Sequence, residues 1–343
     1  MKMIDDTQKL INIPGVRLYG IDFFESLFLE NVESSDIYTN LLNITFPKNK
    51  EYFQTIYRKS LYLTKMPCMD YTDYNFRDIN ISKCIFHKNS KLPTNNDLFQ
   101  NIKDKSLYGT VLPYGDYSSY DFSDVTLNNF NITKNILLPT DYNFFKKLRH
   151  SSFSKSLISD KNLKNYNFDN VKINKTRFIN IVEFPDDKNL FKQVRNSDIS
   201  YCVFINCNLE KYSMVNVNIQ GTFFNDKSTL IDDVKLFQKV LNKDLTETRL
   251  PFNDYSTYDF NDVILNRTIF SRHSKLPKDE LFFIKLKECY YPQLPIDTYI
   301  NIQNYNLTNI YLNLSDNMYI TNEQRYLLLK LYPKEVRNGM LIL

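Results

Sequence analysis

The sequence contains few side chains of the types that perform catalysis or bind metals. Its 343 residues include three histidines and five cysteines, and the run Cys84-Ile-Phe-His87 is the spacing that could suggest a metal site. No zinc-ligand spacing, phosphate-binding glycine loop, dinucleotide fingerprint or serine-nucleophile elbow is present. We therefore predict a protein that is not an enzyme, with no catalytic residues, no metal site and no cofactor.

The cysteines are expected to be reduced and structural. Their odd number argues against a disulfide framework, and Cys202 and Cys207 stand five residues apart at positions that we expect to be buried. The alternatives are a functional thiol pair at these two positions or a nucleophile at Cys289. A nucleophilic cysteine needs a neighbouring base, and Cys289 has no histidine near it in the sequence.

Carboxylates are paired at Asp186-Asp187 and at Asp232-Asp233. Such pairs could perform general acid–base chemistry, but aspartate also caps the first turn of a helix and interacts favourably with the helix dipole. The notable polar residues recur from one part of the chain to the next. A catalytic site needs one asymmetric group of residues, whereas a recurring pattern produces a surface. We therefore interpret both pairs as helix caps.

Basic residues recur in segments that we expect to be helical, and acidic residues recur between those segments. The basic set comprises Lys146, Lys147, Arg149, Lys188, Lys192, Arg195, Lys235, Lys239, Lys243, Lys285 and Lys287. The acidic set comprises Asp78, Asp121, Asp124, Asp169, Asp259 and Asp262. If the helices stack, their potentials add and form a basic ridge beside an acidic wall. The candidate binding ridge is Lys146, Lys147, Lys192, Lys239 and Lys285; the alternative is an ordinary solvated helix face.

The elements that carry these residues follow from a repeat of 46 residues. Its first landmark is a tyrosine, at Tyr74, Tyr120, Tyr166, Tyr212 and Tyr258, with a sixth copy one residue late at Tyr305. Its second landmark is an apolar residue followed by proline (or once by isoleucine), which begins at Phe46, Leu92, Leu138, Phe184, Leu230 and Leu276. Two landmarks that keep one register along most of the chain indicate a solenoid of stacked repeats.

Within each repeat, large apolar residues recur at every fifth position, as at Leu112, Tyr117, Phe122, Leu127 and Ile132. A second residue, mostly apolar or small, stands two positions before each of them. Side chains two apart on a strand point to the same side, so a five-residue step suits one side of a polygonal coil. The intervening residue, such as Asp121, Asn167 or Asp259, is expected to face water. Stacked coils would pair their backbones about 4.8 Å apart.

This pattern resembles the pentapeptide-repeat family, whose consensus is a small or apolar residue, Asp or Asn, Leu or Phe, and two polar residues. Good matches begin at Val125, Cys207 and Val217. The resemblance covers residues 66–312 and implies a right-handed, four-sided β-helix. The chain departs from the family because Tyr or Val often fills the first slot and because each repeat is interrupted once. We expect a β-solenoid with helical insertions, an α+β repeat protein whose 46-residue units are capped at both ends.

Each interruption is expected to be a helix of two or three turns. Thr94, Thr140, Asp186 and Asp232 are suitable N-caps directly after the second landmark. Apolar pairs follow at helical spacing, namely Phe99 and Ile102, Phe145 and Leu148, Phe191 and Val194, Phe237 and Val240, and Phe283 and Leu286. Helices of this length are not stable alone, so they must pack on the coil.

The chain is expected to have three parts: residues 1–45 form an N-terminal cap or degenerate repeat, 46–314 the repeat solenoid, and 315–343 a C-terminal capping helix. Solenoids need terminal units that cover the open core. Thr321–Gln324 is a capping-box pattern that opens an apolar segment ending before Pro333. In members of the family a C-terminal helical segment can form a dimer interface, so the resemblance implies a homodimer through this helix.

Composition excludes several classes of protein. The formal net charge is only +4, with 43 basic and 39 acidic residues, so charge alone does not indicate nucleic acid or membrane as partner. No apolar run approaches the roughly 18 residues that span a bilayer, and the N-terminus lacks a classical signal peptide. We expect a soluble protein without a membrane partner, either cytoplasmic or exported without a classical signal.

Three functions are compatible with these observations. The leading hypothesis is a non-catalytic scaffold that mediates protein–protein interaction through an extended repeat surface. The second is a nucleic-acid- or topoisomerase-related role, in which direct binding along the basic ridge is favoured over mimicry of DNA because the chain is not acidic. The third is a bacterial effector that acts on a host protein, without a separate catalytic domain. The sequence does not identify the partner.

Overall fold

The computed structural model describes residue 46, residues 49–271 and 274–277, residue 282, and the strand residues 311–313, 336–337 and 340–342. The chain divides into two compact units, which are described separately. Unit 1 contains residues 1–158 and 165–167, and unit 2 contains residues 159–164 and 168–343. Residues 1–45, expected to form a cap, lie outside the described residues.

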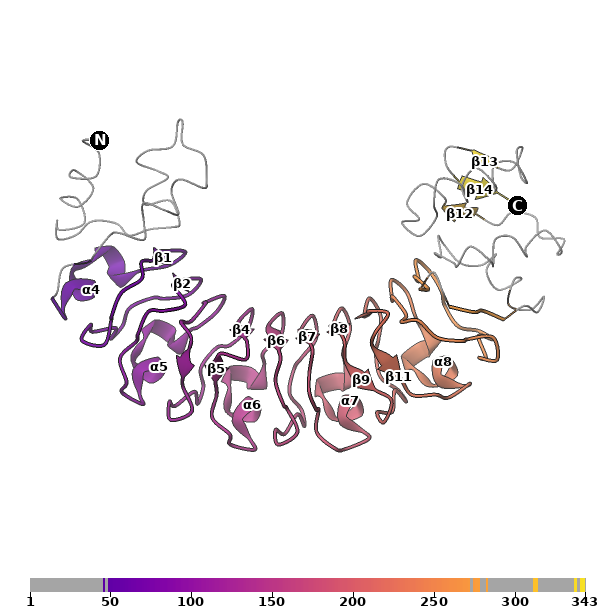
Figure 1. Cartoon of the computed structure of the whole chain (residues 1–343), viewed down its shortest axis with the longest axis horizontal. Coiled ribbons are helices and arrows are strands. Elements are labelled where there is room, and N and C mark those ends of the chain that lie inside the picture. The colour runs from indigo at the N-terminus through magenta and orange to yellow at the C-terminus, as the bar shows by residue number, and fades with distance from the viewer. Residues whose placement is uncertain are drawn as a thin grey trace. The chain divides into compact units, whose positions relative to one another are not determined.

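Unit 1 is built from short parallel strands that join segments far apart in the chain (Figure 1). The pairs are β1 (Lys65–Met66) with β2 (Ile85–Phe86), β3 (Gly115–Asp116) with β5 (Ile136–Leu137), and β4 (Asn131–Ile132) with β6 (Leu157–Ser159). A single bridge continues the first ladder from Ile85 to Val111. Each strand has only two or three residues, so the ladders depend on the side chains packed beneath them.

Unit 2 repeats this pattern. The strands β7 (Arg177–Ile179), β8 (Val203–Ile205) and β10 (Phe223–Phe224) form one parallel ladder, and β9 (Asn208–Leu209) pairs with β11 (Thr229–Leu230). Isolated bridges continue the first ladder to Arg249 and Ile269. The remaining strands are antiparallel: β14 (Met340–Ile342) pairs with both β12 (Tyr311–Asn313) and β13 (Val336–Arg337).

The register of the parallel pairs shows how one repeat is divided. In unit 1, Lys65 pairs with Ile85 and Ile85 with Val111, at separations of 20 and 26 residues. In unit 2, Phe223 pairs with residues 20 before it and 26 after it in the same alternation. Each 46-residue repeat therefore contributes two successive strands or bridges to the ladder. We call the stretch of chain from one such position to the next a level. The longer level is the one that contains the helical insertion.

Each insertion is a single helical turn followed by a 3₁₀ turn. The helices are α4 (Tyr52–Thr55), α5 (Leu98–Asn101), α6 (Phe144–Lys147), α7 (Leu190–Gln193) and α8 (Leu236–Lys239). The 3₁₀ turns are η2 (Tyr57–Lys59), η3 (Lys103–Lys105), η4 (Arg149–Ser151), η5 (Arg195–Ser197) and η6 (Leu241–Lys243). The prediction of two or three helical turns was wrong.

Pairing with an earlier level is what ends the helix. The residue after each helix, such as Leu148 or Val240, has extended backbone geometry. The next amide then donates to a carbonyl of the earlier level, as Arg149 N does to Val125 O at 3.0 Å. A further helical turn would remove this amide from the ladder. The middle residue of each 3₁₀ turn has a positive φ that changes the direction of the chain, for example 58° at His150.

The predicted N-caps were also wrong. Thr94, Thr140, Asp186 and Asp232 each stand four residues before the first helical residue, and the residues that directly precede the helices make no side-chain cap hydrogen bond. The aspartate that follows three of these positions has a different role. Asp141, Asp187 and Asp233 each accept a hydrogen bond from the backbone amide two residues later. This Asx turn directs the chain into the helix.

The five-residue pattern does mark the core. Leu112, Tyr117, Phe122, Leu127 and Ile132 are all buried, as are the equivalent residues of the other described repeats. The apolar pairs of the insertions are buried as well, from Phe99 and Ile102 to Phe237 and Val240. The pair Phe283 and Leu286 lies outside the described residues.

A hydrogen bond connects the two sequence landmarks. The hydroxyl of Tyr120 donates to the carbonyl oxygen of Pro93 at 2.7 Å, and that of Tyr212 donates to Pro185 O at 2.9 Å. Proline has no amide to place in a ladder, and its buried carbonyl needs a donor. Where isoleucine replaces proline, at residue 231, the hydroxyl of Tyr258 donates to Asp232 instead. Where proline is present, this hydrogen bond from the tyrosine of one landmark to the proline carbonyl of the other explains why the two landmarks recur together.

The expectation for the C-terminus is partly corrected. Residues 315–343 were predicted to form a capping helix, but β13 and β14 lie within this segment and pair with β12. The segment 325–332, which was expected to be the helix itself, lies outside the described residues.

Candidate interaction surfaces

The described cysteines are mostly part of the core. Cys202 and Cys207 are buried, as predicted, Cys84 is buried as well, and Cys68 is exposed. The Sγ of Cys84 donates to Leu61 O at 2.6 Å, and that of Cys202 donates to Ile173 O at 3.2 Å. Burial raises the pKa of the Cys84 and Cys202 thiols far above the ordinary value and that of Cys207 to about 11. These three thiols are held as neutral core residues, whereas a nucleophile must be a thiolate.

The histidines of the described chain do not gather other ligands. His87 is half-buried, and its Nδ1 accepts a hydrogen bond from the amide of Asn89 at 3.2 Å. His150 is exposed in η4. Within the part of the chain that the structure describes, no group of three histidine, cysteine or acidic side chains could hold a metal ion. His273 and Cys289 lie outside that part.

The acidic wall has a local explanation in the backbone. Asp78, Asp124 and Asp262 have φ values of 60°, 58° and 55°, a left-handed conformation that Asp and Asn adopt more readily than most residues. Asp121 and Asp259 instead accept hydrogen bonds from the backbone amides two residues later. Asp169 is also exposed. The recurrence of these residues therefore follows from turn geometry, whatever else their charges do.

The candidate ridge residues occupy the helical turns. Lys146 and Lys147 lie on α6 in unit 1, whereas Lys192 lies on α7 and Lys239 on α8 in unit 2. Lys146 is half-exposed and the other three are exposed, while Lys285 lies outside the described residues. The structure thus places four of the five at the predicted elements, divided between the two units.

Two of these lysines are ion-paired within their own insertion. Lys147 pairs with Asp141, and Lys239 pairs with Asp233. At the same position of α7, the side-chain amide of Gln193 donates to the Asp187 carboxylate at 2.7 Å. The lysine lowers the pKa of its aspartate in both pairs, chiefly through the hydrogen bond between them. This position therefore has a structural partner in the turn before the helix, and part of its charge is compensated.

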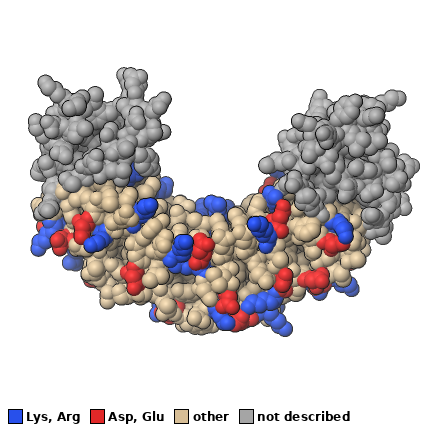
Figure 2. Space-filling view, in the orientation of Figure 1, with Lys and Arg blue, Asp and Glu red and all other residues tan. Residues whose placement is uncertain are grey.

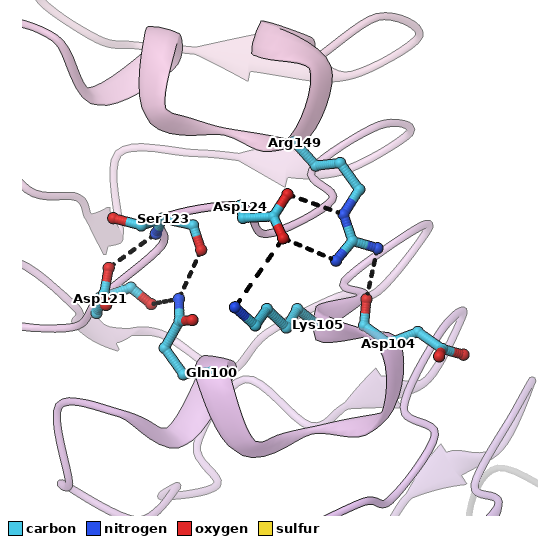
Figure 3. A network of polar contacts seen from close by, with 7 residues as sticks. All are labelled: Gln100, Asp104, Lys105, Asp121, Ser123, Asp124 and Arg149. Carbon is cyan, nitrogen blue, oxygen red and sulfur yellow. Dashed lines mark hydrogen bonds and ion pairs between the residues drawn. The ribbon is translucent and has the colours of Figure 1, made fainter.

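A similar contact joins successive levels in unit 1 (Figure 3). The guanidinium of Arg149 donates to both carboxylate oxygens of Asp124, at 3.2 and 3.3 Å, and to Asp104 O at 2.8 Å. Lys105 lies 4.0 Å from the same carboxylate. The hydrogen bond from Arg149 is the main cause that lowers the pKa of Asp124. Basic and acidic side chains are thus interleaved here, and Figure 2 shows them side by side on the face drawn.

The insertions also expose apolar side chains that the sequence interpretation missed. Tyr142 has 61% of its surface exposed and Val234 has 46%. They occupy the same position of their repeats, just before the helical turn, where the intervening repeat has Lys188. Alignment of the repeats in columns could have found this position, because neither residue belongs to the five-residue core pattern.

An asparagine ladder in unit 2 was missed as well. The side chain of Asn180 donates to Asp160 at 3.1 Å, that of Asn206 donates to Asn180 at 2.7 Å, and that of Asn225 donates to Asn206 at 2.9 Å. These residues are 19 to 26 apart in sequence, so the register had to be known before they could be grouped.

Comparison with known proteins adds no identification. No protein-family model matches this chain, and no curated protein or solved structure is similar to it. The resemblance to pentapeptide-repeat proteins therefore stays a prediction from the sequence pattern. Among the described residues, no helix has the length and apolar character needed to cross a membrane.

Proposed function

We propose that the protein is a non-catalytic scaffold, a β-solenoid of the pentapeptide type that binds a protein partner through the surface of its helical insertions. The proposal takes the two levels per repeat as two turns of a coil. Twenty residues correspond to four five-residue sides, and the longer turn contains the insertion in addition. Such repeats create an extended surface without any catalytic requirement.

The observation that carries this proposal is how the described chain uses its reactive groups. Buried thiols and tyrosine hydroxyls donate to backbone carbonyls, as at Cys84 and Tyr120. Carboxylates serve turns and ion pairs, as at Asp141. A catalytic site needs groups poised for a substrate and a pocket to hold it. Here the thiols, tyrosine hydroxyls and carboxylates named above take part in contacts within the fold. We therefore propose that the protein functions by binding a partner at its surface.

The insertions are the favoured part of this surface. They expose large apolar side chains at Tyr142 and Val234 next to the lysines of the helical turns. Aromatic and aliphatic residues surrounded by charged ones are typical of protein interfaces. Because the insertions interrupt the five-residue pattern, they are also the part of the repeat that the coil itself does not require.

The test is affinity capture with the full chain as bait in a lysate of the organism that encodes it. The insertion variant combines Lys146→Gln, Lys147→Gln, Lys192→Gln and Lys239→Gln with Tyr142→Ser. Glutamine suits Lys147 and Lys239 because Gln193, at the same position of α7, makes the equivalent contact to Asp187. It suits Lys146 and Lys192 because Gln238 occupies the same position in α8. We expect the wild-type chain to retain a partner whose affinity for the purified insertion variant falls about tenfold or more, as loss of an aromatic anchor predicts.

The matched control is a variant in which three lysines outside the insertions, Lys83, Lys88 and Lys134, become glutamine. It should retain the same protein partner with unchanged affinity. Equal losses in both variants, or a purified partner that binds both variants and the wild type alike, would contradict the proposal. Circular dichroism and thermal unfolding of each variant establish that all of them are folded.

A further inference from the structure

Within unit 1, most of the described lysines outside the insertions lie on one face. The face is formed by residues 62–68, 82–88, 108–114, 128–134 and 154–158, which include β1, β2, β4 and most of β6. Backbone hydrogen bonds join these segments in order, for example Ile85 N to Thr64 O and Val111 N to Cys84 O. In Figure 1 the labels of β1, β2, β4 and β6 lie along the upper edge of unit 1, and α5 and α6 lie at its lower edge. We call this surface the strand face.

The strand face contains basic residues and no acidic ones. Its five segments include Lys65, Lys83, Lys88, Lys134 and Lys155 and not one Asp or Glu. This separation contrasts with the insertions, where lysine and aspartate are paired. In the described part of the chain, Lys88, Lys134 and Lys155 are exposed and take part in no ion pair. A surface with one sign of charge produces a potential that attracts an anionic partner.

Tyrosine rings alternate with these lysines at both edges of the strand face. At one edge the ammonium of Lys83 lies 5.4 Å from the ring centroid of Tyr62 and 5.8 Å from that of Tyr108. A hydrogen bond to Tyr62 raises the pKa of Lys83. Gly109 leaves room for this arrangement, because a Cβ there would meet Lys83 at 2.9 Å.

At the other edge the order is reversed, and the register of the segments places Tyr114 between Lys88 and Lys134. The amide of Tyr114 donates to Lys88 O at 2.9 Å, and the next amide, that of Gly115, donates to Asn135 O, directly after Lys134. The ring of Tyr114 is 49% exposed. Between the two edges, Ile85 and Val111 are only half-exposed, so no apolar side chain protrudes from the middle of the face.

We propose that the strand face of unit 1 binds single-stranded nucleic acid. Lysines near aromatic rings, here the half-exposed Tyr62 and Tyr108 and the exposed Tyr114, are the combination that holds a single strand, because the cations contact the phosphates and the bases stack on the rings. An acidic peptide would use the lysines and leave the ring of Tyr114 without a stacking partner. A lipid surface would require protruding apolar side chains, which the middle of this face does not have. This proposal is independent of the protein-binding function of the insertions.

Unit 2 provides a contrast within the same chain. Its corresponding segments contain Asp226 and Glu247. The Glu247 carboxylate accepts hydrogen bonds from Tyr201 at 3.2 Å and from Arg267 at 3.1 Å. The ring of Tyr201 lies over Gly221, with the Lys175 ammonium 5.6 Å from its centroid, but its hydroxyl bonds to this acidic side chain. We assign the site to unit 1 alone.

The test measures fluorescence anisotropy of a labelled oligothymidylate titrated with the full chain over a range of salt concentrations. The face variant is Lys83→Gln, Lys88→Gln and Lys134→Gln, and the ring variant is Tyr114→Ala. We expect the face variant to bind about tenfold or more weakly and to reduce the slope of log affinity against log salt by about 2, for three lost phosphate contacts. The ring variant should lose about tenfold in affinity with its salt slope unchanged.

The charge-matched control is Lys146→Gln, Lys192→Gln and Lys239→Gln on the insertions, which should bind the oligonucleotide as the wild type does. The proposal is overturned if the folded wild-type chain does not bind at low salt, or if the control weakens binding as much as the face variant. It is also overturned if duplex DNA, polyglutamate or phosphatidylglycerol vesicles bind as tightly and Tyr114→Ala has no effect. Capture of a protein partner through the insertions would still stand in each of these cases.

Discussion

At the residue scale, single hydrogen bonds explain why particular residues recur in this chain. Aspartate and asparagine recur because they tolerate a left-handed backbone, as at Asp124, or because they close a turn, as at Asp121. Tyrosine recurs because its ring fills the core while its hydroxyl reaches a buried carbonyl. A recurring polar residue is therefore evidence of a recurring backbone geometry before it is evidence of a binding site.

The tyrosine–proline hydrogen bond leads to a prediction. Tyr120→Phe leaves the ring in place but removes the donor to Pro93 O, and a buried carbonyl without a partner costs about 1–2 kcal/mol of unfolding free energy. The control is Tyr114→Phe, because that residue is largely exposed and surface changes usually stay within about 0.5 kcal/mol. Urea unfolding of both variants measures the difference. Equal effects would mean that the recurring bond does not contribute to stability.

At the element scale, the helical insertions are attached to the neighbouring levels by side chains and by backbone. The side-chain amide of Gln100 on α5 donates to Asp121 O at 3.2 Å and to Ser123 O at 2.7 Å, on the following level (Figure 3). Gln54 on α4 makes the same two contacts 46 residues earlier. A single helical turn is not stable alone, so its geometry depends on these contacts and on the buried phenylalanine beneath it.

We therefore expect Gln100→Ala to destabilise the protein by about 1 kcal/mol, since it removes two hydrogen bonds to carbonyls that water can partly satisfy. Amide hydrogen exchange should increase in α5 and in the loop that contains Ser123. Lys103→Ala, an exposed change in the adjacent 3₁₀ turn, serves as the control and should alter neither quantity. Unchanged exchange in α5 of the glutamine variant would show that these bonds do not hold the insertion.

At the scale of the whole molecule, stability is expected to reside in the inward positions and not in the polar surface between them. Leu127 has no exposed surface, whereas Asp121, six residues earlier, is exposed. Because the two positions are close in sequence, a difference in unfolding free energy between variants at these sites reflects burial and not location along the chain.

Leu127→Asp should unfold the protein or cost several kcal/mol, because it places an unpaired charge in the core. Asp121→Asn should change the unfolding free energy by less than about 0.5 kcal/mol, because the asparagine oxygen can still accept from the Ser123 amide. Thermal unfolding monitored by circular dichroism measures both. Similar shifts for the two variants would show that the inward positions do not carry the stability.

The sequence by itself determined which residues are inside. Side chains two apart on a strand point to the same side, and the same pair of inward positions recurs every five residues. The burial of Phe122 and Leu127 can therefore be predicted from spacing alone. It also located the insertions, because their apolar pairs break that step. It did not determine where the helices begin or end. Helix propensity favours a longer helix after Thr140, and only the amide that Arg149 contributes to the earlier level ends it after one turn.

The tertiary structure alone decided which surface residues are neighbours. Backbone pairs between levels join residues 20, 21 or 26 apart, and those separations depend on how each repeat divides into two levels. Lysines grouped by element therefore suggested a ridge on the helices, where Lys147 is in fact paired with aspartate. Lysines grouped by level lie on the strand face, beside Tyr62 and Tyr114. The physical reason is that core positions obey local periodicity, whereas a surface is assembled from residues that only the register brings together.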